Sequence, residues 1–274
     1  MRMAQKSVSA PFAHRVIGWT VSVARPVISI GALLLIWELA VQFRWINGFL
    51  FPAPSAIFAS LLADAGPGGD LWKHVGMSLY RLLAGMALAI VFGTLIGIAI
   101  GMTHWGRLIF KPIISALMPV PTLAWTPILL LIIGIDNRTT ILVVFIAASF
   151  EVIYTIITGI EQMSSRVFWV ARSMGATRMQ IFWKVIVMGI TPYLITGVKL
   201  GVGYGWRALI AAEMLAASSY GLGFMIFHAS EYMAIEMIYG GIFCIAILGL
   251  LLENVVLRRI EIATVEKWGV QVER

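Results

Sequence analysis

Four charged residues lie inside long apolar stretches of this chain, and they are its first candidates for chemistry. They are Glu151, Lys199, Arg207 and Glu213. A charge at the centre of a bilayer costs roughly 2.5–3.5 kcal/mol on insertion scales, so each one needs a counter-charge or access to water. Lys199 is near one end of its stretch and can extend its ammonium group to the membrane surface. The other three require a partner or a polar path.

Arg207 stands near the middle of its stretch, and two interpretations are open for it. Glu213 follows six positions later, about 240° around a helix, so these two side chains do not face each other. Arg207 can instead pair with Glu151 of the preceding stretch as a structural ion pair. It can also line a polar path and attract a small anion.

Prolines support a path because they interrupt a third apolar stretch, in the run MPVPTLAWTPILL. Proline removes a backbone donor and kinks a helix, and a membrane helix tolerates this where protein or water satisfies the freed carbonyl groups. A kinked helix of this kind is typical of an element beside a pathway. The predicted path residues are Pro121, Trp125, Glu151, Trp206, Arg207 and Glu213.

Signatures of catalysis and of metal binding are missing from the sequence. It contains no G-x-x-x-x-G-K-[ST] phosphate-binding loop, so nucleotide hydrolysis would have to occur in a partner chain. The four histidines are far apart in the sequence and lack metal-ligand spacing. The single cysteine, Cys244, cannot form a disulfide within the chain. We therefore expect no enzyme active site, no metal and no cofactor in this chain.

The composition is that of an integral membrane protein. Of the 274 residues, 60% are hydrophobic and only 12% are charged, about half the charged fraction of soluble domains. The net charge of +7 does not indicate nucleic acid, because the basic residues are scattered between apolar stretches. No cleavable signal peptide is recognisable, so the first apolar stretch is expected to be a retained anchor.

Six stretches are long enough to cross a bilayer, which needs about 20 residues of helix. They cover residues 27–43, 82–102, 113–134, 139–159, 192–217 and 237–257. Most Lys and Arg residues fall on one side of these stretches, which places both termini in the cytoplasm. The predicted fold is an all-α polytopic membrane protein, with a cytoplasmic tail at residues 1–26, a six-helix domain at 27–257 and a second tail at 258–274.

Between the first two stretches, FPAPSAIFASLLADAG predicts a short helix at the outer membrane surface. Ser55 is its expected N-cap, and Ile57, Leu61 and Leu62 are expected on one face. A turn at residues 66–69 closes it. Two glycine series at intervals of four predict close helix packing. They are Gly93, Gly97 and Gly101 in the second stretch, and Gly197, Gly201 and Gly205 in the fifth.

The loop between Glu161 and Pro192 has an ordered pattern that a plain connection does not need. On a helical wheel, five residues fall within about 80° of one another. They are Ala171, Gly175, Met179, Phe182 and Ile186. Thr177 and Gln180 have the spacing of a capping box, and Thr191–Pro192 can cap the next span. The amphipathic helix either rests on anionic lipid or inserts into a groove of a soluble partner.

The loop resembles the EAA loop of bacterial ABC-importer permeases, with Ala171 and Gly175 matching that pattern. Trp169 stands where the pattern has Glu, Val170 at the first Ala, and Val185, Val187 and Met188 replace its final Ile, Leu and Pro. In that family the loop is the coupling helix that docks on the ATPase. The resemblance implies this role for Trp169, Ala171, Gly175, Ala176, Arg178, Met179 and Phe182.

The wider chain is similar to the nitrate/sulfonate/taurine branch of these permeases over roughly residues 50–257. The segments that carry the resemblance are LFPAPSAIF, SLYRLLAGMALAIVFGTLIGIAIG, PVPTLAWTPILLLIIGI, ITGVKLGVGYGWRALIAAEML and GLGFMI. It implies a type I importer fold, a second permease copy (a homodimer), two ATPase subunits that hold ATP and Mg, and a periplasmic or lipid-anchored substrate-binding protein. It also implies the bacterial inner membrane as location and a solute of the sulfonate, taurine or nitrate kind.

Two rival functions differ in what the sequence should contain. An ion-coupled secondary transporter that works without an ATPase would carry inverted repeats and titratable residues at mid-membrane. No internal repeat is obvious, and the long patterned loop would have no role. A purely structural membrane anchor would explain neither that loop nor the prolines of the third stretch.

Overall fold

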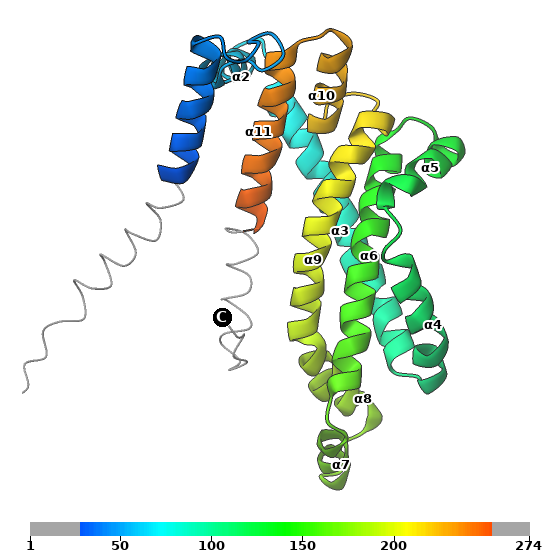
Figure 1. The fold of residues 1–274 in the computed structure, drawn as a ribbon. Coiled ribbons are helices and arrows are strands. Elements are labelled where there is room, and N and C mark those ends of the chain that lie inside the picture. Colours follow the sequence, from blue (N-terminus) through cyan, green and yellow to red (C-terminus); the bar gives the residue numbers. More distant parts are fainter. Residues whose placement is uncertain (1–27, 254–274) are drawn as a thin grey trace, which may run out of the picture. The chain divides into compact units, whose positions relative to one another are not determined.

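A computed structural model describes residues 28–253 of the chain (Figure 1). The predicted tails and residues 254–257 of the sixth predicted span lie outside the described residues. The chain divides into two units, residues 1–62 and 63–274. Throughout the described residues the regular structure is helical.

The first unit contains an apolar helix, Ile28–Gln42, and the beginning of α2, Pro54–Ala65. The sequence predicts Ser55 as the N-cap of α2, but Ser55 lies inside the helix. The Glu38 carboxylate takes over the capping role, since it accepts hydrogen bonds from the Ser55 backbone N–H at 3.0 Å and from its hydroxyl at 2.8 Å. A carboxylate at a helix N-terminus satisfies free N–H groups and complements the helix dipole. Of the three residues expected on one face, Ile57 and Leu61 are buried, whereas Leu62 is 72% exposed.

The second unit is built around three long helices. They are α3 (Leu71–Gly101), α6 (Asn137–Gln162) and α9 (Met188–Ala216). Within the described part of the chain these three, with α9 counted from Arg178, are the helices long and apolar enough to cross a membrane. A fourth crossing is reached if the bent pair α4 (His104–Leu117) and η1–α5 (Thr122–Ile133) counts as one span. The helices Ile28–Gln42 and α11 (Ile235–Leu251) are apolar but shorter.

The third predicted span, 113–134, is not a straight helix. The chain bends by 95° between α4 and the segment formed by η1 (Thr122–Trp125) and α5 (Thr126–Ile133). Pro119 and Pro121 lie in the break and Pro127 in the first turn of α5. Proline cannot continue the hydrogen-bond ladder but fits the start of a new helix, which explains a break here followed by a new start.

Helices α3, α6 and α9 pack side by side (Figure 1), and both glycine series face α6. A Cβ added at Gly93 would lie 3.0 Å from the side chain of Val152, and one at Gly201 would lie 3.2 Å from that of Ala148. The remaining glycines also approach α6 closely. Gly97 faces Ile156, Gly101 faces Ile160, Gly197 faces Val152 and Thr155, and Gly205 faces Val144.

Between α6 and α9 the chain forms α7 (Ser165–Ser173), a turn, α8 (Arg178–Ile181) and the π-helical segment η2 (Phe182–Val187). The predicted capping box is confirmed, because Thr177 and Gln180 exchange side-chain and backbone hydrogen bonds. Gly175 has φ +79° in the turn, a conformation that glycine adopts without strain. One expectation was wrong: α8, η2 and α9 follow one another without a break, so Thr191–Pro192 lies inside α9 and starts no helix.

Two further helices complete the described chain. They are α10 (Leu222–Glu231), which follows α9 after a short connection, and α11, which packs against α10. Helix α10 also contacts α3 and α9. The connection at residues 217–221 therefore brings α10 back against the two long helices near the end opposite the α7–α8 loop (Figure 1).

Candidate functional site

A buried ion pair joins α3 to α9. The Arg81 guanidinium donates from Nη1 to Glu213 Oε1 at 2.7 Å, and neither side chain has any exposed surface. Arg81 Nε and Nη2 also donate to Asn137 Oδ1, at 2.9 and 2.6 Å, which adds the start of α6 to the network. A buried charge pair needs further hydrogen bonds to offset its desolvation, and these contacts supply them.

The same carboxylate anchors the start of α10. Glu213 Oε2 accepts from the backbone N–H of Gly223 at 3.0 Å, and Ser78 donates its hydroxyl to the carboxylate at 2.8 Å. The Ser78 oxygen in turn accepts from the N–H of Leu222 at 2.9 Å. The N-cap of α10 is Gly221, which has no side chain to cap the helix, so Ser78 and Glu213 satisfy its free donors from neighbouring helices.

His74 extends this anchoring by one residue. Its Nδ1 lies 3.0 Å from the backbone nitrogen of Gly221 and 2.9 Å from the carbonyl oxygen of the same residue. Side chains of α3 and α9 thus contact the backbone of three consecutive residues, Gly221 to Gly223. Glu213, which the sequence predicts on a path, is therefore enclosed in a structural network. The sequence analysis did not identify Arg81, His74 or Ser78 as members of this network.

Arg207 and Glu151 do not form an ion pair in this structure, which corrects the structural interpretation of Arg207. The Arg207 guanidinium lies 5.9 Å from the centre of the Tyr204 ring, a cation–π distance, and the residue is exposed. Glu151 is only 8% exposed. Its backbone oxygen accepts a hydrogen bond from the Thr155 hydroxyl at 2.8 Å, and its side chain belongs to no ion pair among the described residues.

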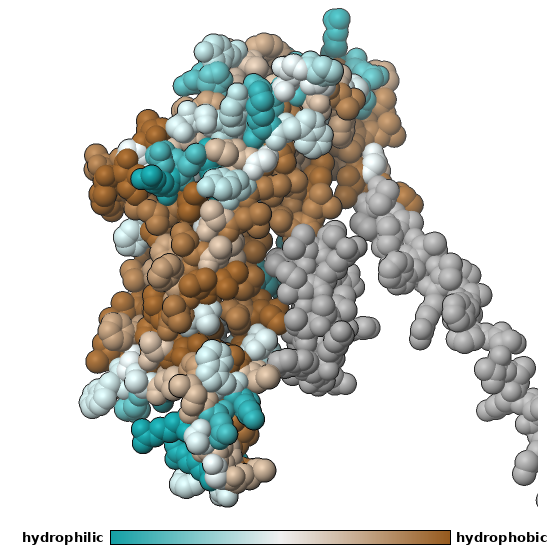
Figure 2. Space-filling model, turned by 180° about the vertical axis from the view of Figure 1, so that it is seen from behind, coloured by the Kyte–Doolittle hydropathy of each residue, from teal (hydrophilic) through white to brown (hydrophobic). Residues whose placement is uncertain are grey.

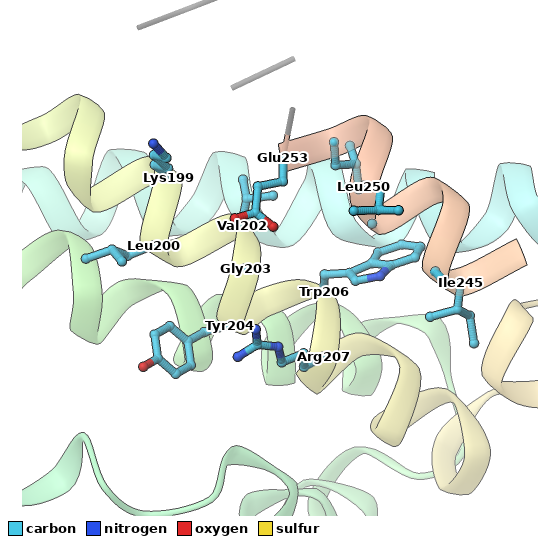
Figure 3. A pocket seen from close by; sticks show the side chains of 13 residues that line it. Lys199, Leu200, Val202, Gly203, Tyr204, Trp206, Arg207, Ile245, Leu250 and Glu253 are labelled. Carbon is cyan, nitrogen blue, oxygen red and sulfur yellow. The ribbon is translucent and has the colours of Figure 1, made fainter. Parts of the chain in front are cut away.

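A groove of about 650 Å³ runs between α9 and α11 (Figure 3). The indole of Trp206 points toward α11, and a Cβ added at Gly249 would lie 3.1 Å from its Nε1 atom. Arg207 and Tyr204 lie next to each other and point away from α11 (Figure 3). Trp206 is therefore a packing residue, 7% exposed, whereas Arg207 lies on the open side of α9.

The remaining predicted path residues come from the bent third segment. Pro121 precedes η1 and is exposed, and Trp125 ends η1 and is half-buried. Both η1 and α5 contact α6 and α9. The structure thus brings the bent segment beside the two helices that carry Glu151 and Arg207.

The α7–α8 loop exposes a set of large apolar side chains at the end of α6 and α9. Trp169 is 68% exposed, Met174 82% and Met179 67%. Ile186, by contrast, is 7% exposed and packs on α6 side chains such as Val152 and Ile156. The predicted stripe is therefore not one face, because the turn at Gly175 separates Ala171 from the other members. Ala176 and Phe182 are half-buried, and Arg178 is exposed.

The surface of the described helices separates into zones by polarity. Figure 2 shows a broad hydrophobic belt, with hydrophilic residues gathered at the end that carries α7 and α8 and at the opposite end. Exposed large hydrophobic side chains of the long helices include Leu83, Val91 and Leu95 of α3. Such a belt between polar ends is what a multi-pass membrane protein presents to lipid.

Comparison with known proteins identifies the class. The family described as "Binding-protein-dependent transport system inner membrane component" matches residues 78–261, and the chain belongs to this family. The fold is similar to a chain of the MetNI methionine ABC transporter in an inward-facing conformation. That match has a TM-score of 0.60 at 19% identity and covers 72% of this chain and 99% of that chain.

Curated relatives place the chain in one branch of the family. The taurine transport system permease TauC of Escherichia coli is 36% identical over 229 residues, covering 82% of this chain and 83% of TauC. The nitrate import permease NrtB of Synechocystis is 30% identical, covering 85% and 86%. The putative aliphatic sulfonates permease SsuC of Bacillus subtilis is 29% identical, covering 87% and 84%. The chain is thus an ABC transporter permease of the nitrate/sulfonate/taurine branch.

Proposed function

We propose that this chain is the membrane subunit of an ATP-driven importer in the bacterial inner membrane. It passes a small, anion-bearing solute of the sulfonate, taurine or nitrate kind from an external binding protein into the cell. Family membership and the three relatives support this assignment. A second copy of the chain completes the path, and two ATPase subunits supply the energy from ATP and Mg.

The observation that carries the proposal is the position of the α7–α8 loop. It leads from the end of α6 into the start of α9, the two helices with the most extensive mutual packing. No flexible linker intervenes, since α8, η2 and α9 form one stretch of 39 residues. A partner that binds the exposed Trp169 and Met179 and moves the loop therefore moves α9 with it. This rigid connection favours docking on a partner over resting on lipid.

The path that this movement would open lies on the exposed side of α9. Arg207 presents its guanidinium there without a carboxylate partner among the described residues, and an exposed guanidinium is suited to sulfonate, nitrate or carboxylate oxygens. The bent segment with Pro121 and Trp125 forms the neighbouring wall. In a homodimer, this side of α9 would face the second copy.

We also propose the topology that the sequence predicts, with six spans and both termini in the cytoplasm. The α7–α8 loop then lies on the cytoplasmic side, where an ATPase can reach it, and the start of α10 lies on the outer side. Labelling single cysteines introduced at exposed Met174 and exposed Tyr232 with a membrane-impermeant reagent in intact cells tests this assignment. We expect the cysteine at position 232 to be labelled and the cysteine at position 174 to be protected.

Reconstitution tests the importer function itself. Proteoliposomes would contain this chain with its ATPase, and would receive the binding protein and radiolabelled taurine, an alkyl sulfonate or nitrate. The proposal predicts uptake that needs both ATP and the binding protein. Uptake driven by an ion gradient without the ATPase would instead establish the secondary-transporter alternative.

A further inference from the structure

A basic groove lies between α4 and the end of α6. Helix α4 runs beside the part of α6 that leads to α7 (Figure 1), and its Ile114 packs against α6. The groove has a volume of about 450 Å³ and is closed on the α6 side by Glu161. The α4 residues that line it are spaced by three and four positions, which places them on one side of that helix. They include His104, Arg107, Leu108, Lys111 and Pro112.

The groove carries more positive than negative charge. The described residues that line it include one carboxylate, Glu161, which two cations share. Its Oε1 lies 3.9 Å from Arg107 Nε, and its Oε2 forms an ion pair with Lys111 Nζ. Arg107 also donates from Nη1 to the backbone oxygen of Gly101, at the end of α3. One positive charge is therefore left over, and it is accessible, because the side chains of Arg107 and Lys111 are 30% and 28% exposed.

The buried pair Arg81–Glu213 shows what a closed structural ion pair looks like in this protein. It consists of one cation and one carboxylate, and both side chains are fully buried. Its charges cancel, and the hydrogen bonds to Glu213 come from within the chain. In the groove the charges do not cancel and the cations face a cavity. The group around Glu161 therefore retains the capacity to bind an anion.

An apolar surface continues directly from the groove along α4. Leu108 lines the cavity and is also 58% exposed. Beyond it, three large side chains fall within about 80° of one another on a helical wheel, away from Ile114 and α6. They are Trp105, Ile109 and Ile113, which are 70%, 50% and 49% exposed. A ligand that matches both surfaces has an anionic head and an apolar tail, whereas a free anion would use the groove alone.

We propose that the α4–α6 groove binds the phosphate of an anionic phospholipid. The Arg107 guanidinium donates to the phosphate oxygens, the Lys111 ammonium adds a second charge, and the acyl chains lie along the exposed apolar face of α4. Basic pockets between membrane helices bind acidic headgroups on the cytoplasmic side, where the proposed topology puts this groove. The bound lipid ties α4 to the end of α6, beside the start of the α7–α8 loop.

Lipid titrations of the purified full-length chain in detergent, followed by native mass spectrometry, test this site. The probes are phosphatidylglycerol and phosphatidylcholine with the same acyl chains, since both carry a phosphodiester but only the first has a net charge. The wild type should bind its first phosphatidylglycerol about fivefold more tightly than phosphatidylcholine. Lys111→Gln should weaken phosphatidylglycerol binding by about fivefold, the effect of one cation near the membrane surface. Arg172→Gln, which removes an exposed cation of α7 outside the groove, should leave the affinity unchanged.

Glu161→Gln separates lipid binding from a purely structural role of the groove. It removes both ion pairs, yet it should strengthen phosphatidylglycerol binding, because it frees both cations from the competing carboxylate. An affinity that stays the same or falls in this variant would overturn the proposal, as would equal affinities of Lys111→Gln and Arg172→Gln or no preference of the wild type for phosphatidylglycerol. Displacement of the lipid by millimolar inorganic phosphate would assign the groove to free phosphate and would also overturn it. ATP-dependent uptake measures the importer function separately from all these results.

Discussion

The Arg81 guanidinium donates to the Glu213 carboxylate at 2.7 Å across the α3–α9 interface, and both side chains are fully buried. Removing one partner leaves the other as a buried charge without compensation, which costs about 3–5 kcal/mol. Arg81→Met should therefore sharply lower the apparent melting temperature of the purified chain in detergent.

The exposed pair Lys73–Asp70 on the same helix provides the control. Its side chains are 60% and 45% exposed, so Lys73→Met should leave the melting temperature unchanged. Equal effects of the two substitutions would show that the buried network is not what holds α3 to α9. The double variant Arg81→Met/Glu213→Leu should recover part of the loss, because it leaves no unpaired charge.

Ser78 should control the local stability of α10. Its hydroxyl donates to Glu213 and its oxygen accepts from the backbone N–H of Leu222. Ser78→Ala removes both contacts and leaves a buried N–H unsatisfied, at a cost of about 1–3 kcal/mol. Hydrogen exchange followed by mass spectrometry should show faster exchange at the start of α10. Unchanged exchange there, with exchange accelerated elsewhere, would contradict the anchoring role.

Close approach of α3 to α6 predicts a steric effect at Gly85. A Cβ at this position would lie 2.6 Å from the Val144 side chain, closer than real contacts. Gly85→Ala should destabilise the chain by about 1–3 kcal/mol through overpacking. Gly76 on the same helix has no atom within 4 Å of such a Cβ, so Gly76→Ala is a matched control. That control should be neutral or slightly stabilising, since alanine favours helix. Thermal unfolding in detergent compares the two.

Glu151 should respond to neutralisation in the opposite way from Glu213. Its side chain is 8% exposed and belongs to no ion pair among the described residues, so Glu151→Gln should raise the melting temperature in the absence of solute. The gain in the free energy of unfolding is at most roughly 2.5–3.5 kcal/mol, the insertion cost of a charge at the membrane centre. Glu213→Gln should lower the melting temperature. A drop with both variants would mean that Glu151 has a structural partner.

Features set by neighbouring residues were predictable from the sequence. The apolar lengths located the long helices, because a membrane requires about 20 apolar residues wherever a helix crosses it. Thr177 and Gln180 gave the start of α8 because a capping box involves only one helical turn. The prolines located the 95° break, since each removes a local hydrogen bond.

Features that depend on distant residues were not predictable in the same way. Arg81 and Glu213 are separated by 132 positions, so no local sequence pattern connects them. One available signal was overlooked: Ser78 and Arg81 share a helix face beside an apolar run. The Arg207–Glu151 pairing, one of the two interpretations that the sequence left open, is absent from the described ion pairs for a related reason. Matching charges on adjacent helices do not reveal whether the packing lets them meet, and here Arg207 lies over Tyr204 instead.

The coupling role of the α7–α8 loop is the central claim, and Gly175 gives the most direct test of it. Gly175 has φ +79° and no atom within 4 Å of an added Cβ, so a large side chain there projects from the loop surface. Gly68, with φ +93° and equally open surroundings, lies in the turn after α2 and provides a control with similar backbone strain.

The measurement is ATP-driven solute uptake in proteoliposomes, together with the amount of ATPase that copurifies with the chain. Gly175→Trp should abolish uptake and reduce the bound ATPase while leaving the helical circular dichroism spectrum unchanged. Gly68→Trp should retain both ATP-driven uptake and the normal amount of bound ATPase. Wild-type uptake and normal ATPase binding by Gly175→Trp would contradict the account.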